Sequence, residues 1–490
     1  MDRDLVRLIY SGLVKYDENG EIVPDLATGY TIDENKKIYT FELKENIYWH
    51  DNEPITTDDI LFTIKSIKNL EYKSPLKNSF NGVEINKIND KIIQFTLEEP
   101  FSPFLSILTV GIIPKHLWYS IPAFGASLAE LNIKPIGSGP YMFKTLIRDS
   151  NGNVKQYSLE SFSKYYNNVY IDELNFKFYP DFETGVKALE NKNIEGLIYL
   201  PKEYKNIKNK KIDLKNLNFP QYTGIFFNPN NNALLKEINF RKILNLSINK
   251  KRILNEAINK DGKIIHSPVL PGLLGYNKEL KNEEFNFKKS EEILEELGYI
   301  LTEEENFRIK KETKDEEEQK ILSVKITTID QIENVKTINI IKENWESLGI
   351  KTELEIIDKK EIKKVIEERN YQIFLYGEVI NINYGLYPFW HSSQNQYPGL
   401  NLNLLSNKDI DTYLEDERKS NTKTEKEKLI NKFQEKLLEL HFAIFLYNPT
   451  YIYPISKKIN GLKDSQFINL PADRFNNINS WYIKTKRTKK

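Results

Sequence analysis

Apolar and polar residues alternate over residues 38–43, which is the pattern of a strand with one buried face. Turn-forming residues follow at 46–51, and Thr56 then precedes an acidic stretch. A threonine before an acidic first turn marks a helix N-terminus, because its side chain can accept from free backbone N–H groups. The pattern therefore predicts a strand, a turn and a capped helix that runs to Ile67.

Strand and helix patterns recur along the rest of the chain. Short β-type runs are predicted at 157–162, 173–179, 223–228 and 322–327, and one long buried strand is predicted at 441–456. Helices are predicted at 182–190, at 238–258 with Asn239 as the cap, and at 425–439, while 285–299, 322–327 and 340–358 have the order of a βα-rich domain. Strands that alternate with helices indicate an α/β fold.

Two further segments have simple structural interpretations. Residues 135–143, PIGSGPYMF, predict a Gly-rich turn that enters a strand, and the absence of a following GK[ST] argues against a phosphate-binding loop. The charge run at 302–320 predicts a solvated hairpin or loop.

The segment 376–394, YGEVININYGLYPFWHSSQ, shows neither the apolar period of a helix nor that of a strand. Gly and Pro interrupt it, and it is rich in rings and amides, which are groups that hold a polar organic solute. We interpret it as a binding loop whose candidate ligand contacts are Glu378, Asn381, Asn383, Tyr384, Trp390 and His391. Packing is an equal alternative for Trp390 and the favoured one for His391. Further candidate contacts are Tyr222 and Thr223, before a predicted strand, and Tyr10 and Ser11 near the start.

Composition limits the classes of protein that the chain can represent. Its 490 residues, 40% of them apolar, suffice for about three domains. Lys plus Arg and Asp plus Glu both number 70, so no overall field attracts nucleic acid or an anionic surface. Cysteine is absent, which excludes disulfides, thiolate zinc sites and Fe–S clusters. No apolar run reaches the roughly 18 residues of a membrane span.

Motifs for catalysis or metal binding are also absent. The histidines at 50, 116, 266, 391 and 441 lack metal-ligand spacing, and neither HExxH nor GxSxG occurs. We therefore predict no catalytic residue, no metal ligand, no cofactor and no nucleic-acid partner. A peptide or glycan hydrolase stays an alternative, because acidic pairs can always be imagined among so many carboxylates. His50 is interpreted as a structural turn residue.

Several motifs together resemble the peptide and nickel type (family 5) of extracellular solute-binding proteins of ABC importers. A P-x-L-A segment at 24–27, a YTF-x-L strand at 39–43, a W-H-D turn at 49–51 and a T-x-x-D helix start follow one another in the family's order. GSGPY at 137–141, Arg241 in its helix and FWHSSQ at 389–394 match as well. The resemblance covers residues 5–463.

The resemblance implies a periplasmic-binding-protein fold with two lobes, a hinge and three domains. We place domain I at 1–25, 144–233 and 440–490, domain II at 26–143, and domain III at 234–439. The family implies export, so a signal or lipid anchor and an earlier natural start are expected. The implied location is the extracellular side of the cytoplasmic membrane or the periplasm, with membrane contact only through an anchor or a permease.

The implied function is capture of peptides in a cleft between the lobes and delivery to ABC permease subunits, by a monomer that is not an enzyme. Main-chain hydrogen bonds can hold a peptide with little dependence on its sequence. In relatives an Asp of the binding loop pairs with the peptide's α-ammonium, but Asn383, Tyr384, Gly385 and Leu386 occupy that acidic core here. Unless Glu378 or Asp409 replaces it, longer or N-blocked peptides, an oligosaccharide or a metal chelate are alternative solutes.

Overall fold

A computed structural model describes residues 2–101, 103–201, 204, 206–207, 209–280, 283–302, 306–310, 321–380, 385–420 and 422–484. The chain divides into unit 1, residues 1–219 and 451–490, and unit 2, residues 220–450. The backbone therefore passes between the units twice, at 219–220 and at 450–451. The division into three domains that we expect from the sequence stays a prediction.

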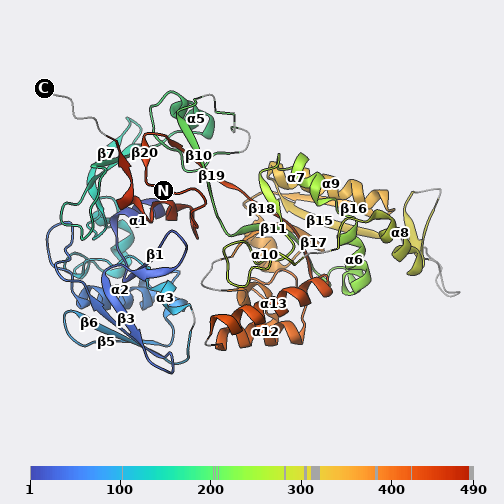
Figure 1. Cartoon of the computed structure of the whole chain (residues 1–490), viewed down its shortest axis with the longest axis horizontal. Helices are drawn as coiled ribbons and strands as arrows, with labels where there is room; N and C mark the ends of the chain where they lie inside the picture. The colour runs from blue at the N-terminus through green and yellow to red at the C-terminus, as the bar shows by residue number, and fades with distance from the viewer. Residues whose placement is uncertain are drawn as a thin grey trace. The chain divides into compact units, whose positions relative to one another are not determined.

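Unit 1 contains a four-stranded antiparallel sheet in the order β3-β4-β6-β5 and a three-stranded antiparallel sheet in the order β7-β8-β9, with the pairs β1-β2, β10-β19 and β20-β21 beside them (Figure 1). Its strands are β1 (Val14–Tyr16), β2 (Ile22–Pro24), β3 (Ala27–Ile32), β4 (Ile38–Leu43), β5 (Val83–Lys87), β6 (Ile92–Leu97), β7 (Tyr141–Arg148), β8 (Val154–Ser161), β9 (Glu173–Lys177), β10 (Ile212–Leu217), β19 (Tyr451–Ser456), β20 (Ile459–Asn460) and β21 (Tyr482–Ile483). Its helices are α1 (Asp2–Ile9), α2 (Thr57–Lys68), α3 (Phe104–Ile107), α4 (Lys115–Trp118) and α5 (Phe182–Glu190), with 3₁₀ turns η1 (Leu70–Tyr72), η2 (Lys77–Phe80), η3 (Ala123–Leu128), η4 (Glu130–Asn132), η8 (Pro471–Phe475) and η9 (Ile478–Ser480).

Unit 2 is built on a six-stranded mixed sheet in the order β12-β18-β11-β17-β15-β16, in which β15 is parallel to both of its neighbours. Its strands are β11 (Gln221–Phe227), β12 (Gly262–Ile264), β15 (Ser323–Ile329), β16 (Lys351–Ile357), β17 (Ile373–Val379) and β18 (Ala443–Pro449), with the separate hairpin β13 (Tyr299–Leu301) and β14 (Arg308–Lys310). Its helices are α6 (Ile238–Leu246), α7 (Lys250–Glu256), α8 (Phe287–Glu296), α9 (Ile332–Ser347), α10 (Ile362–Glu368), α11 (Tyr387–Trp390), α12 (Lys408–Lys419) and α13 (Lys423–Glu439), with η6 (Ala233–Lys236) and η7 (Ser392–Gln394).

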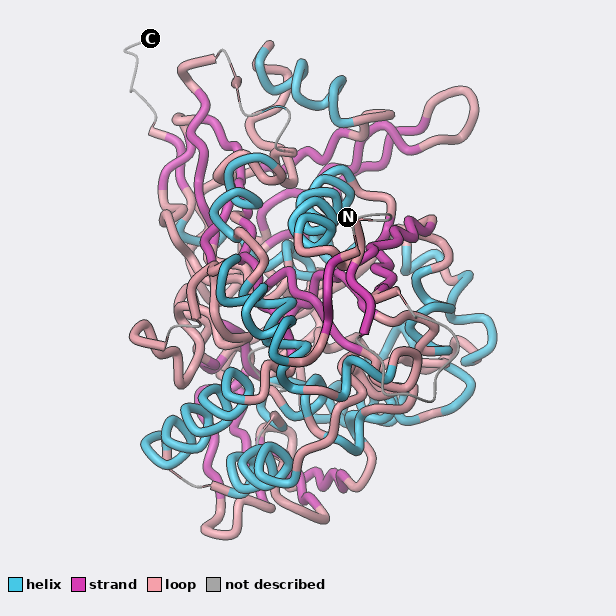
Figure 2. The backbone as a smooth tube through the Cα atoms, turned by 90° about the vertical axis from the view of Figure 1, so that its right-hand side faces the viewer, coloured by secondary structure: helices cyan, strands magenta, loops and turns pink. Residues whose placement is uncertain are grey.

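Both faces of the six-stranded sheet are buried, so helices lie on each side of it. Along β11, Ile225 and Phe227 join a cluster with Trp345 of α9, whereas Tyr222 and Phe226 join a second cluster that includes residues of α12 and α13. This alternation is the two-residue period of a strand, which sends successive side chains to opposite faces. Helices and strands are both distributed along the described chain, in agreement with the predicted α/β class (Figure 2). In the described ranges, none of the helices combines the length and hydropathy that crossing a membrane requires.

Local sequence signals predict several elements correctly. The strand at 38–43 is β4, and the helix from residue 57 is α2. The Thr56 side chain accepts from Asp58 N, and the Asp59 carboxylate accepts from Thr56 N, so a capping box fixes the start of α2. The predicted helix at 182–190 is α5.

Two predicted elements are each divided in the structure. The predicted helix 238–258 consists of α6 and α7, because the Asn249 side chain accepts from Arg252 N and begins a new helix. The predicted cap Asn239 is wrong, since Glu237 occupies the cap position of α6 without a side-chain bond. The predicted strand 441–456 consists of β18 and β19, which pair in different sheets.

Of the predicted charge run at 302–320, residues 308–310 form β14, and residues 303–305 and 311–320 lie outside the described residues.

The predicted Gly-rich turn before β7 packs directly on the backbone near the start of the chain. A Cβ on Gly137 would lie 2.0 Å from Ile9 O, and one on Gly139 would lie 2.4 Å from Leu8 O. Gly139 N donates to Ile9 O at 2.7 Å. His50 bridges the turn, because its Nδ1 accepts from Gly137 N at 3.1 Å and its Nε2 lies 3.1 Å from Gly139 O. Burial lowers the pKa of His50 to about 4, so the ring is neutral and structural.

We predict that Gly137→Ala destabilises the protein, because the new methyl group meets a backbone atom that cannot turn aside. The expected loss of unfolding free energy is roughly 3 kcal/mol or more, measured by urea denaturation. Gly125→Ala is the matched control, because a Cβ there meets nothing within 4 Å. Equal stability of the two variants would contradict the close packing of this turn.

Candidate functional site

The predicted binding loop is only partly irregular. Residues 376–379 belong to β17, residues 387–390 form α11, and residues 392–394 form η7. The prediction that the whole of 376–394 lacks regular structure is therefore wrong at both ends. Asn381, Asn383 and Tyr384 lie outside the described residues, and their contact with a solute stays a prediction.

Trp390 lies in the core of unit 2, where its ring is 2% exposed. Its centroid is 5.6 Å from that of Phe445, 6.1 Å from that of Phe433 and 6.3 Å from that of Phe226. Its indole N–H has no hydrogen-bond partner among the described residues. This is the packing alternative that the sequence leaves open, and contact of Trp390 with a solute stays a prediction.

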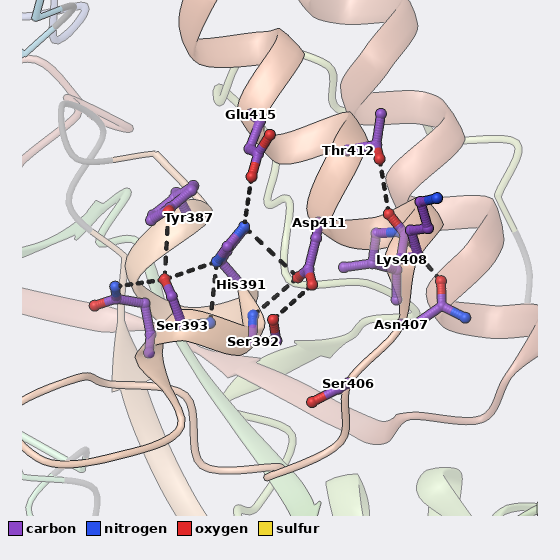
Figure 3. Close-up of polar contacts among 12 residues, drawn as sticks. Tyr387, His391, Ser392, Ser393, Ser406, Asn407, Lys408, Asp411, Thr412 and Glu415 are labelled. Carbon is purple, nitrogen blue, oxygen red and sulfur yellow. Dashed lines mark hydrogen bonds and ion pairs between the residues drawn. The ribbon is translucent and has the colours of Figure 1, made fainter.

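His391 belongs to a polar cluster that fastens the end of the loop to α12 (Figure 3). Its Nδ1 accepts from Ser393 N at 3.1 Å, which places the ring proton on Nε2. Nε2 lies 3.3 Å from Glu415 Oε1 and 3.8 Å from Asp411 Oδ1. Asp411 also accepts from Ser392 N at 2.8 Å and from Ser392 Oγ at 2.6 Å.

Tyr387 extends this cluster, because it covers one face of the His391 imidazole. Its ring stacks on that of His391 with centroids 4.1 Å apart and planes 16° apart. The guanidinium of Arg418 lies 4.3 Å from the centroid of Tyr387, a cation–π distance. The ring nitrogens of His391 thus face groups of the protein itself, and its place matches the favoured packing interpretation.

Glu378 and Tyr222 form a buried pair in the middle of the six-stranded sheet. They stand opposite each other on β17 and β11, and the Tyr222 hydroxyl donates to the Glu378 carboxyl. Burial raises the pKa of Glu378 from 4.5 to about 8, against the smaller effects of Tyr222 and Arg369. The carboxyl is therefore mostly neutral at pH 7. Thr223 follows on β11 and is also buried.

Asp409 is the second residue, after Glu378, that the sequence offers as a replacement for the missing acidic core. It lies in the first turn of α12, where its Oδ2 is 3.7 Å from Lys436 Nζ. Glu417, further along the same helix, is not among the site residues that the sequence predicts. Its Oε2 lies 3.9 Å from where a Cβ on Gly385 would stand, and burial raises its pKa. No sequence signal distinguishes it from the other acidic residues of α12.

In unit 1, Tyr10 and Ser11 lie where three backbone segments meet. Ser11 is buried, its N donates to Ser138 Oγ at 3.2 Å, and its carbonyl accepts from Ile112 N at 2.9 Å. Tyr10 is half-buried, and burial raises the pKa of its hydroxyl to about 12. Ser11 is therefore fixed by hydrogen bonds. We call Tyr10, Ser11 and Ser138 the Ser11 wall, and contact of Tyr10 and Ser11 with a solute stays a prediction.

Beside this wall lies a charged cluster that sequence reasoning missed. Asp25 accepts from Gly12 N at 3.2 Å and from the hydroxyl of Tyr166, and it lies 3.3 Å from Lys15 Nζ. The Lys44 ammonium is 4.0 Å from the ring centroid of Tyr166. In the sequence, the P-D-L-A segment at 24–27 and the tyrosine pair at 165–166 are the features that point to this cluster.

Among the described residues, no group of three or more His, Asp and Glu side chains could hold a metal ion. The titratable groups found are paired with backbone, tyrosine or lysine, and they lie beside rings and amides. Such groups occur in both units of the chain.

Comparison with known proteins identifies the family. The description "bacterial extracellular solute-binding proteins, family 5 middle" matches residues 21–397, and the chain belongs to this family. The resemblance recognised in the sequence motifs is thereby confirmed.

Three relatives illustrate the similarity. The oligopeptide-binding protein AppA of Bacillus subtilis is 23% identical over 98% of this chain and 87% of its own length. Its structure in complex with a nonapeptide covers 98% of this chain and 94% of that chain with a TM-score of 0.74. The dipeptide-binding protein of Escherichia coli is 25% identical, and the alignment spans 59% of this chain and 58% of that protein. The nickel-binding periplasmic protein of E. coli is 24% identical, and the alignment spans 60% of this chain and 56% of that protein. The fold is therefore that of periplasmic solute-binding proteins, as predicted.

We predict that the buried Glu378 makes stability fall with rising pH. In the unfolded chain the carboxyl ionises near pH 4.5, whereas in the folded protein it ionises only near pH 8. Between these values the unfolded state is charged and the folded state is neutral, so each rise in pH favours unfolding. Glu378→Gln should remove this loss and leave a flatter stability profile from pH 5 to about 8 in urea denaturation.

The matched control is Glu353→Gln, an exposed position on β16 of the same sheet. It should leave the pH dependence of the free energy of unfolding unchanged. A profile for Glu378→Gln that parallels the unsubstituted protein would contradict a raised pKa at this position.

We also predict that Asp411→Ala loosens the end of the loop, because Ser392 N and Oγ lose their acceptor. Hydrogen exchange of amides in 387–395 should accelerate by roughly tenfold, which corresponds to the loss of about one charged hydrogen bond. Asp416→Ala on the exposed face of α12 is the control and should leave these amides unaffected. Equal protection in both variants would show that packing alone holds the segment.

Proposed function

We propose that this protein captures peptides outside the cytoplasmic membrane and delivers them to an ABC permease. The observation that carries the proposal is the similarity to the oligopeptide-binding protein AppA over 98% of the chain. The E. coli relative named as a dipeptide-binding protein supports the same solute class. In this proposal the protein acts as a monomer without turnover, and it reaches the membrane through the permease or an anchor.

The positioned residues fit a role in binding. Ser11 and Ser138 in unit 1, and Tyr222 in unit 2, are fixed by hydrogen bonds. A rigid wall loses little entropy when a solute binds, so its contacts contribute more fully to affinity. A peptide held through its main chain needs such walls and few specific side chains. Family members are described as extracellular, which supports a periplasmic or extracellular location.

A metal chelate or haem is the second candidate solute class. The nickel-binding and haem-binding relatives favour it, as does the similarity to the structure of NikZ from Campylobacter jejuni in complex with Ni(L-His), with a TM-score of 0.75. His391, the one histidine of the predicted loop, is held by Ser393, Glu415 and Asp411. Peptides are therefore the better-supported solute.

Native mass spectrometry of gently purified protein tests the proposal. We expect a ladder of bound peptide masses that disappears on denaturation, and saturable binding of an added peptide mixture in titration calorimetry. A fluorogenic peptide library should show no turnover, which separates a binder from a hydrolase. A single non-peptide mass, together with no heat from added peptides, would overturn the peptide assignment.

A further inference from the structure

An exposed apolar patch lies on unit 1 beside the C-terminal end of α2. Leu70 is 70% exposed, Tyr119 75%, Phe124 82% and Leu128 89%. These are the four highest exposures among the large apolar side chains of the described residues. We call these four residues the Phe124 patch.

The patch is one surface rather than four scattered positions. Leu70 is in η1, which packs against η3, and η3 carries Phe124 and Leu128. Tyr119 follows α4, which packs against α2, and its ring centroid lies 6.5 Å from that of Phe62 on α2. Single exposed apolar residues are ordinary on protein surfaces, but a contiguous group marks an interaction site.

Lysines are concentrated in the chain segment that contains Leu70. Residues 65–77 hold Lys65, Lys68, Lys73 and Lys77 against the single acidic residue Glu71, a formal charge of +3 in a chain of net charge zero. Lys73 N donates to the Leu70 carbonyl, so this lysine begins within one turn of the patch. Lys68 Nζ is engaged with the Val83 carbonyl, whereas Lys65 and Lys73 are exposed.

We propose that the Phe124 patch, with the lysines of residues 65–77, binds the anionic surface of a lipid bilayer. Aromatic and leucine side chains enter the interface between headgroups and acyl chains, and neighbouring lysines are attracted by anionic headgroups. The lysines also discriminate against a protein partner, because lysine is depleted in protein–protein interfaces. The inference goes beyond solute capture and does not depend on which solute is bound.

Vesicle co-sedimentation of the 490-residue chain without any added lipid anchor tests this. The probes are vesicles of phosphatidylcholine alone and vesicles in which about one third is phosphatidylglycerol, at low and high ionic strength. We expect binding to the anionic vesicles that weakens with salt. Lys65→Gln and Lys73→Gln should each lower the partition coefficient about fivefold. Phe124→Ser with Leu128→Ser should abolish most binding to the anionic vesicles.

The control is Tyr170→Ser with Ile332→Ser, which removes two exposed apolar side chains outside the patch. Thermal unfolding and peptide titration of every variant show whether it is folded and still binds solute, so failure of this inference is separable from failure of the proposed function. Equal binding to neutral and anionic vesicles, or equal binding by the patch and control variants, would overturn the proposal. Binding only to vesicles that contain a permease would also overturn it and identify the patch as a protein contact.

Discussion

Backbone contact between the turn 137–139 and residues 8–11 joins the start of β7 to the start of the chain in unit 1. The close approach of Gly137 and Gly139 to the carbonyls of Ile9 and Leu8 leaves no room for side chains. The neutral ring of His50 bonds both sides of the turn. The same contact positions Ser138 against Ser11, so the wall that we interpret as part of the site follows from a packing requirement. The position of Ser11 therefore depends on the close packing of Gly137 and Gly139.

Unit 2 contains a buried polar pair at the centre of its sheet. Its central strands carry a carboxyl and a phenol in the core at Glu378 and Tyr222, where an apolar pair would be the simpler choice. Burial keeps the carboxyl mostly neutral at pH 7, and the tyrosine hydroxyl satisfies one of its oxygens. A buried polar pair that is satisfied rigidifies its surroundings, but it makes stability depend on pH. This pair joins β11 to β17, whose last residues begin the predicted binding loop.

The success of sequence reasoning follows the range of the signal. The predicted helix start at Thr56 and the predicted helix 182–190 are set by residues three or four apart, and both predictions are correct. The breaks after Ser247 and at Thr450 depend on a competing cap and on a change of sheet. The Asn249 cap is a local signal that the predicted helix 238–258 overlooks. Apolar periodicity carries no information on which sheet a strand joins, so the break at Thr450 could not be predicted. For the same reason the sequence could not decide between packing and ligand contact for Trp390, whose neighbours Phe226, Phe433 and Phe445 are distant in the chain.

The motif that most clearly indicates the family is thus largely a structural one. Within FWHSSQ, Trp390 packs in the core, and His391 and Ser392 bond the acidic side chains of α12. These residues fix where the loop ends, which explains how the ending can match the family while the core at 383–386 differs. The end of the segment therefore carries part of the family resemblance, whereas an effect of the altered core at 383–386 on the solute stays a prediction.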